Sequence, residues 1–263
     1  MPDLTTPRAG AAGADLMVLV LGGTSEGFDL ARALTREPAA RVVSSLAGRT
    51  ANPRLPIGEV RIGGFGGADG LAAYLRSTGV GMVIDATHPF AATMGGNAEE
   101  GCRQAGVPLL RLERPAWRPI AGDNWTEVDD WDEAANAVGK LSQRVLLAVG
   151  RRELAAFAAL DHVWFLVRSV DPPNPVPAFR QAELLLARGP FALDDERRLL
   201  AGHRIDTILC RNSGGSAADA KLVAARELGI RVVIRRRPPR PAGLPRVSSV
   251  SEAILWVRSM CGR

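Results

Sequence analysis

A short apolar run that stops abruptly at glycine constrains this chain most. Residues 17–21 are all apolar, and Gly22, Gly23 and Gly27 follow directly. A continuous apolar run of this length is typical of a strand that is buried on both faces, as in a parallel sheet. Apolar residues recur at helical spacing over 28–34, which indicates that a helix begins at the glycine turn. The chain therefore opens with a strand, a glycine turn and a helix.

This helix start predicts a binding site for an anion. Free backbone N–H groups and the helix dipole point at any phosphate that lies there. We expect nucleotide phosphate to contact the six residues Gly22, Gly23, Thr24, Ser25, Glu26 and Gly27. Thr24 stands where the dinucleotide fingerprint G-x-G-x-x-G has its second glycine. The pattern therefore also fits an ordinary strand-to-helix turn of an α/β protein.

The second strand, expected at 41–46, ends without an acidic residue. In a nicotinamide-binding unit, a carboxylate here binds the ribose 2′-hydroxyl, whereas an arginine accommodates a 2′-phosphate. This strand end offers Ser44, Ser45, Arg49 and Thr50. If a dinucleotide binds, the sequence favours NADPH over NADH, although Arg49 also fits a solvated loop residue.

A further buried strand, at 81–84, ends in polar residues. Asp85, Thr87 and His88 follow it, and groups at the carboxyl end of a parallel strand lie in the crevice where ligands bind. Asp85 and His88 are therefore the first catalytic candidates. An aspartate here can equally cap the next helix, whose first residue would be Pro89.

Two loops in the second half of the chain combine a strand end, a helix N-terminus and arginine. Such loops bind carboxylates or phosphates by charge-assisted hydrogen bonds. The candidate substrate-binding residues in these loops are Arg151, Arg211, Asn212, Ser213 and Gly214. We expect a pocket for an acidic ligand at the domain interface. Lys221 lies one turn inside the next helix and either reaches this pocket or lies in solvent.

Alternating strands and helices predict an α/β fold with parallel sheets in two domains. The expected divisions are a flexible tail at 1–14, a nucleotide-binding domain at 15–114 and a second α/β domain at 125–263. Prolines and a glycine between 113 and 124 indicate the connection. In the second domain we expect a helix at 182–187 and an amphipathic helix at 251–257.

Composition narrows the function classes. The formal net charge is +5, from 33 Lys and Arg against 28 Asp and Glu, which favours an anionic ligand. The positive run at 235–240 lacks interleaved aromatic residues, so nucleic-acid binding is not expected. Three scattered cysteines suit a reduced, cytoplasmic setting without a metal site or disulfide framework. No apolar run approaches the ~18 residues of a membrane span, and no nucleophile elbow or G-x-x-x-x-G-K-[ST] phosphate loop occurs.

Over residues 17–257 the chain resembles the precorrin-6A reductases of cobalamin (vitamin B12) biosynthesis. The matching segments are VLVLGGTSEG at 18–27, DATHPFA at 85–91, and RNSGG with the downstream KLVAARELGIRVVIRRRP at 211–238. GRREL and ARGPF match more loosely. Each segment alone is weak, but their occurrence in this order over two domains makes the resemblance specific.

The resemblance implies two Rossmann-like domains with the ligands in a cleft between them. It implies NADPH-dependent reduction of the C18–C19 double bond of precorrin-6A, a tetrapyrrole, to give precorrin-6B. By position, the turn at 22–27 would hold the nucleotide, with Arg49 and Thr50 near the 2′-phosphate, and residues 211–214 would receive the substrate. The substrate's acetate and propionate groups would explain the arginine-rich loops without nucleic acid.

The mechanism we expect is hydride transfer to the ring, with protonation of the neighbouring carbon. Asp85, Thr87 and His88 would face the cleft, with Thr87 contacting the cofactor. His88 is the candidate proton donor because its unperturbed pKa of about 6.5 suits neutral pH, unless the substrate's own carboxylic acids supply the proton. The alternatives are a cobalt-precorrin-6A reductase and a non-catalytic module that binds nucleotide or tetrapyrrole. Handover to neighbouring pathway enzymes is a further expectation.

Overall fold

The first apolar run forms strand β1 (Leu16–Leu21) at the centre of a sheet in the computed structural model. The structure describes residues 16–48, 53–175, 177–216, 219–240 and 243–261. The predictions for the tail 1–14, and for Arg49 and Thr50, lie outside the described residues. Side chains of β1 are buried alternately in two different core clusters. The continuous apolar run thus reflects burial on both faces, as the sequence predicted.

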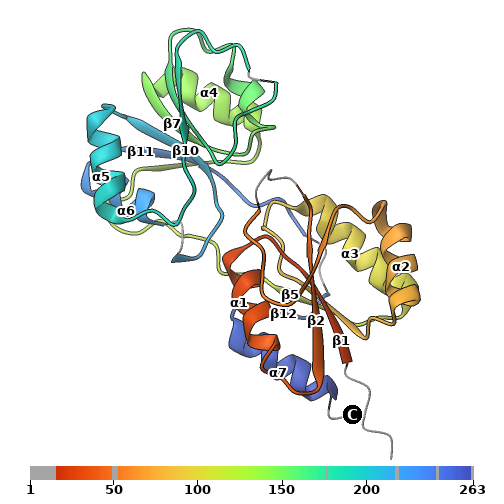
Figure 1. Cartoon of the computed structure of the whole chain (residues 1–263). Helices are drawn as coiled ribbons and strands as arrows, with labels where there is room; N and C mark the ends of the chain where they lie inside the picture. Colours follow the sequence, from red (N-terminus) through yellow and green to blue (C-terminus); the bar gives the residue numbers. More distant parts are fainter. Residues whose placement is uncertain (1–15, 49–52, 176, 217–218, 241–242, 262–263) are drawn as a thin grey trace, which may run out of the picture.

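The predicted parallel α/β architecture is confirmed in two lobes, each with a six-stranded sheet (Figure 1). Every strand pairing in both sheets is parallel. The first sheet has the order β12-β5-β4-β1-β2-β3. Its other strands are β2 (Ala40–Leu46), β3 (Glu59–Ile62), β4 (Met82–Asp85), β5 (Leu109–Leu112) and β12 (Arg246–Val247).

Two helices cover each face of the first sheet. On one face, α1 (Ser25–Leu34) and α7 (Val250–Cys261) share a core with the valines of β1. On the other face, α2 (Gly67–Thr78) and α3 (Ala92–Ala105) pack over the leucines of β1. Because both faces are covered, only the strand ends of this sheet are open to ligands.

The C-terminal segment returns to the first lobe, which corrects the predicted domain boundary. We expected residues 125–263 to form one domain, but β12 pairs with β5 and α7 packs against α1. Ala253 and Val257 of α7 lie in the same core as Val18 of β1. The amphipathic helix at the C-terminus therefore exists, but it covers the first sheet instead of the second.

The second sheet has the order β6-β11-β10-β7-β8-β9. Its strands are β6 (Trp125–Val128), β7 (Arg144–Ala148), β8 (Trp164–Ser169), β9 (Ala182–Leu186), β10 (Thr207–Arg211) and β11 (Arg231–Arg235). The helix α4 (Trp131–Leu141) and the 3₁₀ turn η1 (Leu154–Phe157) cover one face. The helices α5 (Leu193–Gly202) and α6 (Ala220–Glu227) cover the other.

The structure contradicts one helix prediction in this lobe. Residues 182–187, predicted as a helix, include the edge strand β9, which pairs with β8. Two of its leucines, Leu184 and Leu186, are exposed, so the apolar composition that suggested a helix belongs to an uncovered sheet edge.

Among the described helices, none combines the length and the apolar character needed to cross a membrane.

The strand order of each sheet reverses direction at one point, and this positions the site. In the first sheet the chain runs from β1 to β2 on one side and later to β4 on the other. In the second sheet the same reversal occurs between β7 and β10. Ligands of open α/β sheets bind at the carboxyl ends of the strands that flank such a point. A ligand is therefore expected at the loops after β1, β4, β7 and β10.

Candidate functional site

The turn after β1 is built to bring α1 close to the sheet. Thr24 caps α1: its Oγ1 accepts a hydrogen bond from the Gly27 N–H at 3.1 Å and donates one to the Ala86 carbonyl at 2.7 Å. A Cβ on Gly27 would lie 3.3 Å from the Cα of Gly22, so the third glycine allows close helix–strand packing. Gly23 is exposed with φ of 111°, which favours glycine. The Thr24 hydroxyl is thus fully engaged with the backbone of Gly27 and Ala86 and fixes the start of α1.

Glu26, predicted to contact the cofactor, connects the two lobes through its side chain. Its Oε2 accepts a hydrogen bond from Arg114 Nη1 at 2.5 Å, and Arg114 Nε donates to the Ser213 carbonyl at 2.7 Å. The Oγ of Ser25 lies 3.2 Å from the same Glu26 oxygen. The N-terminus of α1 is therefore connected through Arg114 to the loop after β10.

Asp85 is enclosed, which contradicts a direct catalytic contact. Its side chain has 0% exposure, and its Oδ2 lies 3.3 Å from both Arg111 Nε and Arg240 Nη1. The other oxygen accepts hydrogen bonds from the N–H and the hydroxyl of Thr87, at 3.0 and 2.6 Å. Arg240 also donates to the carbonyl of His88. Asp85 thus holds the loop after β4 in place and presents no surface to a substrate.

His88 meets Ser213 across the lobe boundary, 125 residues away in sequence. The ring Nε2 lies 3.0 Å from Ser213 Oγ, and Nδ1 accepts a hydrogen bond from the N–H of Phe90 at 3.2 Å. Because Nδ1 is an acceptor, we assign the ring proton to Nε2, which donates to Ser213. The sequence placed both residues at the cleft, and the structure brings them together.

The charge state of His88 does not fit the predicted role of proton donor. Burial lowers the pKa of His88 to about 2, helped by the positive charges of Arg211, Arg114, Arg237 and Arg240. At neutral pH the imidazole is therefore neutral and carries no acidic proton. His88 instead acts as a neutral hydrogen-bond donor that connects the two lobes.

Replacing His88 by glutamine is expected to reduce the loss of stability in acid. The unfolded histidine binds a proton below about pH 6.5, whereas the folded ring stays neutral, so stability falls by about 1.4 kcal/mol per pH unit. Between about pH 6.5 and pH 5 the wild type should lose about 2 kcal/mol more than His88→Gln. Urea unfolding at both pH values measures this, with exposed His162→Gln as control. Equal losses in all three proteins would mean that His88 is protonated in the folded state.

Asn212 and Gly214, predicted to bind substrate, anchor the connecting segment. The Asn212 carboxamide accepts from the Trp117 N–H and donates to the Trp117 carbonyl, both at 2.9 Å. Gly214 has φ of 68°, and a Cβ there would lie 2.1 Å from the Pro115 carbonyl oxygen. Arg237 donates to the carbonyls of Asn212 and Ser213 at 3.0 and 3.1 Å. Both residues therefore make contacts within the protein, and these contacts shape the loop around Ser213.

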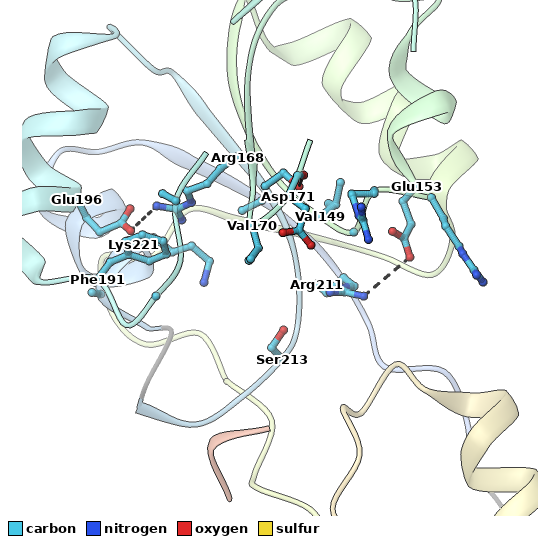
Figure 2. A pocket seen from close by; sticks show the side chains of 18 of the residues that line it. Val149, Glu153, Arg168, Val170, Asp171, Phe191, Glu196, Arg211, Ser213 and Lys221 are labelled. Atoms are coloured by element: carbon cyan, nitrogen blue, oxygen red, sulfur yellow. Dashed lines mark hydrogen bonds and ion pairs between the residues drawn. The ribbon is translucent and has the colours of Figure 1, made fainter. Parts of the chain in front are cut away.

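A cavity of about 910 Å³ opens at the carboxyl ends of β7, β8 and β10 (Figure 2). The end of β2 also lines it, through Ala47 and Gly48 of the first lobe. Four of the predicted substrate-binding residues contribute to its wall: Arg151, Arg211, Ser213 and Lys221. The wall therefore joins the second-lobe loops to the end of β2, the strand that follows the glycine turn and α1.

Charged side chains dominate this wall. Five are cationic and three are acidic: Arg151, Arg152, Arg168, Arg211 and Lys221, against Glu153, Asp171 and Glu196. The excess of positive charge suits a ligand that carries carboxylates. Sequence reasoning missed Arg168, although it directly follows the apolar run of a predicted strand, where the same strand-end rule identified Arg211.

Arg168 and Lys221 form a buried corner of the cavity. Arg168 Nη1 lies 2.5 Å from Glu196 Oε1, and its guanidinium lies 4.2 Å from the centre of the Phe191 ring. Lys221 is only 7% exposed, and its Nζ lies 4.6 Å from the centre of the Trp117 ring. Burial lowers the pKa of Lys221.

The described residues contain no cluster of His, Cys, Asp and Glu that could hold a metal ion.

Comparison with known proteins gives consistent similarities. The family described as precorrin-6x reductase CbiJ/CobK matches residues 17–258. The precorrin-6A reductase of Rhodococcus erythropolis is 49% identical over 246 residues, which cover 94% of this chain and 99% of that protein. A solved structure described as CobK precorrin-6A reductase superposes with a TM-score of 0.87 at 41% identity, covering 93% of this chain and 96% of its own. The cobalt-precorrin-6A reductase of Salmonella typhimurium is 29% identical, covering 84% of this chain and 87% of its own.

Proposed function

Because this chain belongs to the precorrin-6x reductase family CbiJ/CobK, we propose that it uses NADPH to reduce the C18–C19 double bond of precorrin-6A. The enzyme is an oxidoreductase that acts on a CH–CH group, and the product of this reaction would be precorrin-6B. The observation that carries the proposal is the cation-rich cavity at the lobe boundary, next to the strand end that follows the glycine turn. The higher identity to precorrin-6A reductases than to a cobalt-precorrin-6A reductase favours the metal-free substrate.

The β1–α1 turn supports binding of a reduced dinucleotide. Gly22 has room for a ligand, because a Cβ there would meet no atom closer than 3.6 Å. The exposed Gly23 and the free N–H groups at the start of α1 suit a pyrophosphate. At the end of β2, Ser44 and Ser45 leave no carboxylate to compete with a 2′-phosphate. These features favour NADPH over NADH.

The second lobe supports binding of the macrocycle. Precorrin-6A carries several acetate and propionate groups, and Arg151 and Arg211 offer charge-assisted donors for them. Bidentate arginine contacts fix the orientation of a ligand as well as its affinity. The macrocycle would then lie between these cations and the first-lobe residues at the end of β2.

The chain's own residues contribute mainly by positioning. NADPH would supply the hydride when bound, and the residues of both lobes that line the cavity would hold the acceptor carbon in reach of it. Asp85 keeps the loop after β4 ordered, and His88 fixes Ser213 at the cavity edge. We propose that these two residues position the site, in place of the proton transfer predicted from the sequence.

The activity is tested by following NADPH absorbance with precorrin-6A as the second substrate. We expect oxidation of one NADPH for each precorrin-6A consumed, with a lower KM for NADPH than for NADH. Tight binding of both ligands without turnover would support a non-catalytic binding module instead. Faster turnover of cobalt-precorrin-6A would assign the chain to the cobalt-containing substrate.

Replacing Arg211 by methionine is expected to raise the KM for precorrin-6A about tenfold or more, with the KM for NADPH unchanged. A charge-assisted hydrogen bond is worth about 1.5–3 kcal/mol, and methionine keeps the bulk of the side chain. Steady-state kinetics measure both constants. Exposed Arg180→Met is the matched control and should leave both constants unchanged. An unaltered KM for precorrin-6A would remove Arg211 from the substrate site.

A further inference from the structure

Reduction of a carbon–carbon double bond requires a proton as well as a hydride. When the hydride forms a C–H bond at one carbon, the electron pair of the double bond moves to its neighbour. That neighbour must then take a proton from a group in the same cavity. The structure leaves this group open, because His88 is neutral, donates its ring proton to Ser213 and is not part of the cavity wall.

Given the reductase activity proposed above, on which this inference rests, we propose that Lys221 donates the proton that completes the reduction. Its N–H bond breaks as the new C–H bond forms, and the resulting neutral amine regains a proton from solvent. The nucleotide is oxidised and the macrocycle is reduced by two electrons, so the step balances with one proton taken from water.

The geometry places the Lys221 amine at the cavity. Lys221 lies in the first turn of α6, and Figure 2 shows its side chain extending from that helix with the amine end turned towards the cavity. The indole of Trp117, 4.6 Å from Nζ, covers one side of the side chain. Trp117 is itself fixed by Asn212 and by a hydrogen bond to the Gly215 carbonyl. The amine is thus held in a defined place within a buried corner of the cavity.

The surroundings also make the ammonium a usable acid. Burial lowers the pKa of Lys221, and the positive charge of Arg168 adds to this effect. Cys210 on β10, Glu196 on α5 and Asp219 before α6 act in the opposite direction. Burial raises the pKa of the Cys210 thiol, which disfavours a thiolate that would stabilise the ammonium. Glu196 is already paired with Arg168.

The other groups of the wall are poorer donors. Guanidinium groups hold their protons at any ordinary pH, which excludes Arg151, Arg152, Arg168 and Arg211. Carboxyl groups ordinarily have no proton at neutral pH, and the hydroxyl of Ser213 is bound to His88. A lysine with a lowered pKa is the residue type that enzymes use for acid–base chemistry near neutral pH.

The test compares Lys221→Met with Lys140→Met, which changes the other lysine of the chain, an exposed one. For Lys221→Met we expect kcat to fall roughly 100-fold or more, with both KM values within about threefold of the wild type. The wild-type kcat should fall as the pH rises through the pKa of Lys221, and this limb should be absent in the variant. Added ethylamine should restore at least a tenth of the lost rate to Lys221→Ala.

Three outcomes would overturn this role. A Lys221→Met enzyme with kcat near normal and a raised KM for precorrin-6A would make Lys221 a binding residue only. An unchanged pH limb would assign the proton to another group. If the variants do not fold, NMR of the wild type with 15N-labelled lysine still tests the role. A Lys221 signal that titrates at the same pH as that of Lys140 would exclude Lys221 as the proton donor. Loss of NADPH oxidation in the wild type would instead refute the reductase assignment itself.

Discussion

Asp85→Ala is expected to destabilise the protein by about 3–5 kcal/mol, the largest effect on folding that we predict for a single side chain. Arg111 and Arg240 both place a nitrogen 3.3 Å from the Asp85 carboxylate, and their side chains are 1% and 6% exposed. Without the carboxylate, the two buried guanidinium groups lose the one acidic group that both of them contact. Removing one partner of a buried ion pair costs far more than the pair itself contributes.

Urea unfolding of three variants tests this explanation. Asp29→Ala, which removes an exposed carboxylate 3.9 Å from Arg32, should change stability by less than about 0.5 kcal/mol. Asp85→Ala combined with Arg111→Met should recover part of the loss, because one uncompensated charge is removed. If Asp85→Ala were as stable as Asp29→Ala yet inactive, Asp85 would act directly on a ligand, as the sequence first indicated.

Local sequence patterns predicted which segments form strands and helices better than they predicted which of these elements pack or pair together. The run in β1 and the glycines after it determine a strand and a helix start within 11 residues, so they were recognisable without tertiary information. The position of α7 could not be recognised from the sequence, because an apolar helix face fits either sheet and β12 has only two residues. The leucines of β9 likewise suit a helix by propensity, and only pairing with β8 makes them a strand.

The same distinction explains the candidate site. Arg211 and Ser213 were predictable because parallel strands bring their carboxyl ends to one edge of a sheet, whereas for Lys221 the sequence left the pocket and solvent equally open. The ion pairs around the site were not predictable, because they join residues that are far apart in the sequence. Arg237 and Arg240 belong to a run that resembles a solvated basic patch, yet they pair with Glu113 and Asp85, which lie more than 120 residues away. Sequence spacing locates strand ends but cannot assign such pairs.

The turn after β1 gives the second large prediction, an effect on nucleotide binding without an effect on folding. In Gly22→Val we expect the KM for NADPH to rise at least tenfold. A Cβ at Gly22 would lie 3.6 Å from Leu46 and 3.8 Å from the Ser45 carbonyl, both ordinary contacts, so the folded protein has room for a Cβ at this position. A phosphate approaching the start of α1 would meet the added methyl groups and lose hydrogen bonds worth about 1.5–3 kcal/mol each.

Two other glycines separate this effect from general disruption. Gly64 lies in the glycine-rich loop after β3, and a Cβ there would meet nothing within 4 Å, so Gly64→Val should leave the KM for NADPH unchanged. Gly27→Val should disturb folding and binding together, because its Cβ would press on the Cα of Gly22 at 3.3 Å and on Ala86 at 3.5 Å. Steady-state kinetics and urea unfolding on the three variants give six independent values. A folded Gly22→Val enzyme with the wild-type KM for NADPH would place the nucleotide elsewhere, since no pyrophosphate could approach the α1 N-terminus past a branched side chain at normal affinity.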